Sequence, residues 1–113
     1  MMIIEAPVSR ARLMELARGR FGNMVKAVVD VEQNVMAVDG ELHSDEEALL
    51  LENGSRQQDL WGINLYPELG GPEWIEYDSM INLRPSQGNR SRGVDDAALR
   101  ERIAGIVARL VSP

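Results

Sequence analysis

The chain contains no cysteine, a single histidine and a single lysine among its 113 residues. Without cysteine it can form no disulfide, no zinc–thiolate site and no thiol nucleophile. No apolar stretch approaches the ~20 residues that a membrane-spanning helix needs. The start, MMIIEAPVSRARLME, also lacks the basic and long apolar segments of a signal peptide. We therefore expect a cytoplasmic protein without a membrane partner, and we expect no metal and no cofactor.

Composition indicates one folded domain spanning residues 1–113. Apolar residues make up 44% and charged residues 27%, an ordinary balance for a globular protein. No low-complexity or proline-rich linker divides the chain. The net charge of -6 argues against general nucleic-acid binding, because phosphate backbones require a positive protein surface.

Hydrophobic periodicity predicts the elements of the first half. Ser9 can cap a helix over residues 10–18, and glycines follow it. The alternation in MVKAVVDV and the segment VMAV, separated by EQN, predict a hairpin of two strands. Ser44 and Glu47 form the S-x-x-E pattern of a capping box, so we expect the next helix to begin there and to end before Gly54.

The second half predicts another hairpin and a last helix. QDLWGINLYP and EWIEYDSMINLRP are typical of two strands joined by ELGGP, and Asp95 is placed to cap a helix through VDDAALRERIAGIVARLV. The predicted order is (β)αββαββα. We expect an α+β domain with a mostly antiparallel sheet of four to five strands and about three helices packed on one face.

The segment RPSQGNRSRG, residues 84–93, is an arginine-rich, acid-free loop in an acidic protein, directly before a helix N-terminus. Free backbone N–H groups, the helix dipole and arginine side chains all favour an anion. We therefore predict binding of a small anionic ligand or an acidic protein segment here. The predicted binding residues are Arg84, Ser86, Gln87, Gly88, Asn89, Arg90, Ser91, Arg92 and Gly93. Alternatively, the arginines pair with acids of the protein itself, such as Glu41, Asp45, Glu46 or Glu76.

His43 is the chain's only side chain whose usual pKa lies near neutrality. With Glu47 it forms the candidate catalytic pair, in which His43 acts as acid or base and nearby carboxylates raise its pKa. The alternative is a packing residue just before a helix. An enzyme would require His43 and the arginine loop to line one pocket.

Several segments together carry a resemblance: RFGNMVKAVVDVE, GELHSDEEALLLENGS, QDLWGINLYPE and DSMINLRPSQGNRSRGVDD. They resemble a family of small prokaryotic single-domain proteins of unknown function, so the resemblance implies a stand-alone domain but no activity. Three functions stay open: a binding module using the arginine loop, an enzyme acting on a phosphorylated or carboxylated small molecule, and a non-catalytic homodimeric assembly protein.

Overall fold

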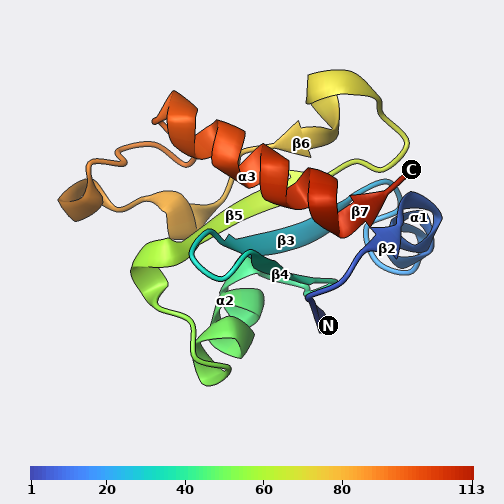
Figure 1. Cartoon of the computed structure of the whole chain (residues 1–113), viewed down its shortest axis with the longest axis horizontal. Helices are drawn as coiled ribbons and strands as arrows, with labels where there is room; N and C mark the ends of the chain where they lie inside the picture. Colours follow the sequence, from blue (N-terminus) through green and yellow to red (C-terminus); the bar gives the residue numbers. More distant parts are fainter.

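The predicted hairpin lies at the centre of the fold. In the computed structural model, which describes residues 1–113, its two strands belong to a five-stranded antiparallel sheet of order β1-β4-β3-β5-β6 (Figure 1). The strands are β1 (Met2–Ile4), β3 (Val25–Asp30), β4 (Val35–Val38), β5 (Leu60–Leu65) and β6 (Ile75–Glu76). β3 pairs with β4 on one side and along its whole length with β5 on the other. The α+β fold and the predicted element order are confirmed.

Two helices cover one face of this sheet. Helix α1 (Arg10–Arg18) has the predicted bounds, and the Ser9 hydroxyl accepts from the backbone N–H of Arg12. Helix α3 (Ala97–Leu110) crosses the sheet in front of β3 and β5 (Figure 1). Its cap is Asp96, whose carboxylate accepts from the N–H of Ala98, so the prediction of Asp95 as the cap is wrong by one residue. None of the helices has the length and apolar character needed to cross a membrane.

The chain ends are joined by a second, two-stranded sheet. Strand β2 (Val8–Ser9) runs parallel to β7 (Val111–Ser112), which directly follows α3. The beginning of α1 and the end of α3 are thereby fixed side by side over the main core.

Helix α2 (His43–Glu52) packs on the opposite face of the sheet, so the prediction that all helices share one face is wrong. Alternation along β3 explains the two faces, since Ala27 and Val29 point toward α3 while Val28 points toward α2. The α3 face holds an apolar cluster of 18 buried residues. The α2 face holds a cluster of only 4, and polar side chains occupy much of the remaining contact.

The N-terminus of α2 is not capped by a side chain. Leu42 occupies the cap position, and the helix begins at His43, so Ser44 lies inside the first turn. The predicted capping box between Ser44 and Glu47 does not form. The predicted end is confirmed, because the chain turns at Gly54 with a φ of 97°, a left-handed conformation that favours glycine.

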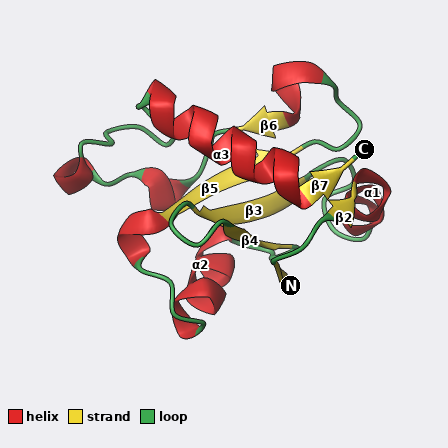
Figure 2. Cartoon of the chain, in the orientation of Figure 1, coloured by secondary structure: helices red, strands yellow, loops and turns green.

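The second predicted hairpin is only partly formed. Its second strand shrinks to the two residues of β6, and the chain continues through short 3-10 turns at Met80–Asn82 and Pro85–Gln87 (Figure 2). On the outer edge of β5, residues 60–63 therefore have no partner strand. The Asn82 side chain takes its place: it accepts from the Gly62 N–H at 2.8 Å and donates to the Gly62 carbonyl at 2.9 Å.

Replacing Asn82 by alanine should therefore destabilise the fold. The substitution leaves the buried N–H and C=O of Gly62 without partners, and each orphaned group costs about 1–3 kcal/mol. We expect Asn82→Ala to lower the free energy of unfolding by at least about 2 kcal/mol in urea denaturation. Asn23→Ala, at an exposed asparagine, is the control and should leave stability nearly unchanged. Equal stabilities of the two variants would contradict the role of Asn82.

Candidate functional site

The first arginine of the predicted anion loop is committed to the fold. The Arg84 guanidinium stacks over the Trp61 ring at 4.0 Å and donates to the carbonyl oxygens of Gln57 and Leu60. Burial lowers the pKa of Arg84 from its usual range. Arg84 therefore closes the open edge of β5 next to Asn82, and its terminal nitrogens donate to groups of the protein itself, while its buried Nε has no partner.

The rest of the loop is organised around Asn89. The buried Asn89 amide donates to the carbonyls of Asn82 and Gly93, each at 2.8 Å, and accepts from the N–H of Asp95. The Asp95 carboxylate in turn accepts from the Arg90 N–H and the Ser91 hydroxyl. Hydrogen bonding to Ser91 and Arg90 holds the pKa of Asp95 below its usual range.

The loop thus satisfies most of its own donors. The Gly93 N–H donates to the Ser91 hydroxyl, and Gln87 donates to the Gln58 carbonyl. Ser86 is exposed on its 3-10 turn, which Gly88 ends with a φ of 81°. The Arg90 side chain extends into solvent without an ion pair. No pocket brings these residues together.

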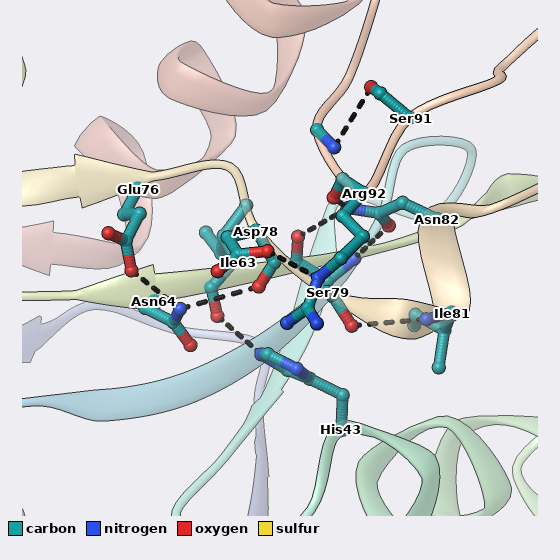
Figure 3. Close-up of polar contacts among 12 residues, drawn as sticks. His43, Ile63, Asn64, Glu76, Asp78, Ser79, Ile81, Asn82, Ser91 and Arg92 are labelled. Carbon is teal, nitrogen blue, oxygen red and sulfur yellow. Dashed lines mark hydrogen bonds and ion pairs between the residues drawn. The ribbon is translucent and has the colours of Figure 1, made fainter.

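Arg92 is the exception in the loop. Its Nε donates to the Asp78 carboxylate at 2.8 Å, while its two terminal nitrogens make no hydrogen bond within the protein. Figure 3 shows the guanidinium extending from the loop toward the His43 ring. The alternative that an arginine pairs with an internal acid is correct for Arg92, although the partner is Asp78 rather than an acid proposed from the sequence.

His43 lies at the first position of α2 and is only 9% exposed. Its Nε2 lies 2.8 Å from the Ile63 carbonyl oxygen on β5 (Figure 3). A carbonyl can only accept, so Nε2 carries a proton and donates it to Ile63. Nδ1 makes no hydrogen bond within the protein.

A cavity of about 170 Å³ brings His43 and Arg92 together. Its wall is formed by residues from β3, the start of α2, the turn after Asp78 and the end of the arginine loop. These residues are Lys26, Leu42, His43, Ser44, Ser79, Met80, Ile81 and Arg92. An enzyme would require His43 and the arginine loop to line one pocket. Of the loop's arginines, Arg92 meets this requirement.

Lys26, the second cation of this cavity, was not identified from the sequence. It lies on β3 opposite Asn64 of β5, half buried, and forms no ion pair with a carboxylate. Its ammonium lies 5.2 Å from the centre of the Phe21 ring. The signal was present in the sequence, because Lys26 alternates with the apolar residues of β3 and must face away from the main core.

The uncapped start of α2 adds donors to the same wall. The backbone N–H groups of His43 and Ser44 have no acceptor within the protein, as expected for the first turn of a helix without a cap. The helix dipole adds partial positive charge at this end. Two side-chain cations, free N–H groups and two hydroxyls, of Ser44 and Ser79, therefore surround the cavity.

The pKa of His43 lies below its usual value, in contrast to the predicted rise. Burial is the main cause, and the positive charge of Lys26 acts in the same direction. The Ile63 carbonyl, the Asp78 carboxylate and the Asn64 side chain oppose the shift without overcoming it. His43 is therefore a neutral imidazole near pH 7, with its lone pair on Nδ1.

Glu47 does not complete a catalytic pair with His43. It lies outside the cavity wall, and its charge acts on Arg84 instead. The buried acid on the His43 side of α2 is Glu46, one turn further on and fully inaccessible to solvent. Its Oε2 accepts from the Gly40 N–H at 2.8 Å, while Oε1 has no partner. Burial raises the pKa of Glu46 to about 9, so its carboxyl group is protonated at neutral pH.

Glycine at two positions allows this packing. A Cβ at Gly62 would lie 2.5 Å from the Cβ of Ser79, and a Cβ at Gly40 would lie 2.6 Å from Cγ of Glu46. The first contact sets the position of Ser79 in the cavity wall, and the second sets α2 against the end of β4.

A larger hollow of about 370 Å³ lies on the other side of α2, between the N-terminus and the helix surface. Its wall contains Arg20 and four carboxylates, Asp39, Glu41, Asp45 and Glu52. Asp39 is already paired with Arg20 and the terminal ammonium, and no group of acidic residues here is arranged to hold a metal ion. The cavity beside His43 is therefore the stronger candidate.

Comparison with known proteins supports the resemblance found in the sequence. Residues 2–110 match a family model described as "Protein of unknown function (DUF5674)". No curated protein and no solved structure matches the chain.

Glu46→Gln should change how stability depends on pH. Between pH 4.5 and about 9 the unfolded chain ionises Glu46 while the folded protein keeps it protonated, so the folded protein binds the extra proton. The free energy of unfolding then falls with rising pH, by about 1.4 kcal/mol per pH unit from this one group. Glutamine cannot ionise, so Glu46→Gln should gain stability relative to the native chain as pH rises.

Urea denaturation at a series of pH values across this range tests the expectation. Glu52→Gln, which removes an exposed carboxylate at the end of the same helix, is the control. Parallel stability curves for Glu46→Gln and the native chain would show that Glu46 is ionised in the folded protein.

Proposed function

The chain belongs to the DUF5674 family, whose function is unknown, and we propose that it is a binding protein for a small oxyanion. The anion sits in the cavity between β3, the start of α2 and the end of the arginine loop. The observation that carries this proposal is the convergence of Lys26 and Arg92 on the uncapped N-terminus of α2. The predicted anion-binding function is kept, and its centre moves from the loop to this cavity.

Charge supports an anionic ligand. The protein carries a net charge of -6, yet two cations line this one cavity. Asp78 is the carboxylate paired with Arg92, and it occupies only the Nε side of this guanidinium. The terminal nitrogens of Arg92 have the fork geometry that suits phosphate and carboxylate oxygens. Free N–H groups at a helix start bind the same oxygens.

The size of the cavity restricts the ligand group. A space of about 170 Å³ suits a single phosphate or carboxylate group rather than a nucleotide or a long peptide. Leu42 and Met80, both on the cavity wall, are 52% and 63% exposed. They provide apolar contacts for the rest of a molecule whose anionic group enters the cavity.

A second candidate function is catalysis, and the free Nδ1 of His43 favours it. A neutral imidazole that is oriented through Nε2 by a backbone carbonyl is equipped to accept a proton. In this case His43 would act as base on a phosphorylated or carboxylated substrate held by Arg92 and Lys26. Turnover that disappears in a His43 variant, while anion binding remains, would distinguish an enzyme from a binding protein.

Titration with inorganic phosphate, followed by amide chemical shifts in NMR, tests the binding function. We expect saturable shifts at His43, Ser44, Lys26 and Ser79. Arg92→Gln and Lys26→Met should each weaken binding about tenfold or more, because a hydrogen bond to a charged group contributes about 1.5–3 kcal/mol.

Arg90→Gln is the matched control, since Arg90 lies two residues from Arg92 in the same loop but outside the cavity wall. It should leave the affinity nearly unchanged. Equal loss in Arg90→Gln and Arg92→Gln, with shifts confined to residues 86–93, would place the site on the loop instead. Absence of saturable shifts would refute the proposed function.

A further inference from the structure

Beyond oxyanion binding in general, we propose that the cavity selects an oxyanion that carries its own proton, such as hydrogenphosphate, over one that does not, such as sulfate. The inference rests on the proposed function and assigns the selectivity to Nδ1 of His43. The hydrogen bond from Nε2 to the Ile63 carbonyl leaves Nδ1 as the ring nitrogen that is free to bind a ligand.

The tautomer of His43 is fixed by β5. The Ile63 carbonyl lies 2.8 Å from Nε2 and can only accept, so the single proton of the neutral ring stays on Nε2. Nδ1 is then an acceptor with no donor inside the protein. The side chain is about nine-tenths buried and lines the cavity, so a ligand there is the natural partner for Nδ1.

The surroundings keep the ring neutral. The positive charge of Lys26 on β3 acts on the ring, and Arg92 from the loop lines the same cavity. Asp78, the one acid acting on His43, is already paired with Arg92. Protonating Nδ1 would create a third cation in a buried position, which costs free energy.

A fully deprotonated oxyanion and a protonated one meet this acceptor differently. Sulfate has only acceptor oxygens, so it places a lone pair against that of Nδ1 or requires a proton to be added to the ring. Hydrogenphosphate donates its O–H to Nδ1 and directs its other oxygens at Arg92, Lys26 and the α2 N–H groups. Sulfate carries at least as much charge at neutral pH, so charge alone would favour sulfate. A preference for phosphate over sulfate would therefore show that Nδ1 of His43 accepts a hydrogen bond from the ligand.

Titrating the native chain with phosphate and with sulfate, at one neutral pH and one ionic strength, tests the inference. We expect phosphate to bind at least about tenfold more tightly, a difference of about 1.4 kcal/mol. Arsenate and selenate form a second matched pair and should follow the same order. If sulfate binds as tightly as phosphate or more so, the inference fails while the proposed function stands. If neither ion binds, the proposed function itself fails.

The single histidine provides a direct readout, because its two ring nitrogens give the only imidazole ¹⁵N signals of the chain. We expect the free protein to show the neutral Nε2–H tautomer, and phosphate to shift the Nδ1 signal as it gains a hydrogen bond. An imidazolium signature in the phosphate complex would overturn the inference. His43→Phe should bring phosphate affinity to or below that of sulfate. If this variant does not fold, the phosphate and sulfate affinities and the ¹⁵N signals of the native chain still test the inference.

Discussion

An incomplete sheet edge determines how the second half of this protein is built. β5 is paired along its whole length with β3, but on its outer side β6 reaches only Asn64 and Leu65. The backbone groups of Leu60 and Gly62 on that side would otherwise be buried without partners, which folded proteins rarely tolerate. Two side chains replace the missing strand: the Asn82 amide binds Gly62, and the Arg84 guanidinium binds Leu60. The sequence around Asn82 and Arg84 is typical of a strand, but in the structure this segment completes the sheet with side-chain rather than backbone hydrogen bonds.

This edge also positions the candidate site. The Asn82 amide donates at 3.0 Å to the carbonyl of Arg92, so the same buried group that closes β5 holds the end of the arginine loop. Close contact between Gly62 and Ser79 fixes the other wall of the cavity. The Ile63 carbonyl, from the same strand, orients His43. A disturbance of the β5 edge would therefore displace Arg92, Ser79 and His43 together, although these residues lie far apart in the chain.

Much of the fold could be predicted from the sequence, because regular elements leave periodic signals. The bounds of α1 and the hairpin of β3 and β4 follow from alternation and from the Ser9 cap. The segment from 72 to 93 could not be predicted, since its structure consists of hydrogen bonds between side chains and backbone that leave no period. The role of Arg84 was missed for the same reason, because a loop arginine that binds carbonyls looks the same in sequence as one that binds a ligand. The site was predicted in part: His43 and Arg92 share a cavity, while Lys26 was hidden within a strand pattern.

The two faces of the sheet differ in the number of apolar residues that they bury, and this difference bears on function. The α3 face buries 18 apolar residues in one cluster, whereas the α2 face buries 4. Beside those 4 it holds His43, a protonated Glu46, and Asn64, whose Oδ1 has no partner. Unpartnered buried polar atoms cost about 1–3 kcal/mol each, and apolar side chains at these positions would stabilise the fold. Proteins depart from such packing mainly at functional sites. Of these groups His43 lines the cationic cavity, and Glu46 and Asn64 lie on the same face of the sheet. The polar packing of the α2 face therefore supports the proposal that this face serves recognition.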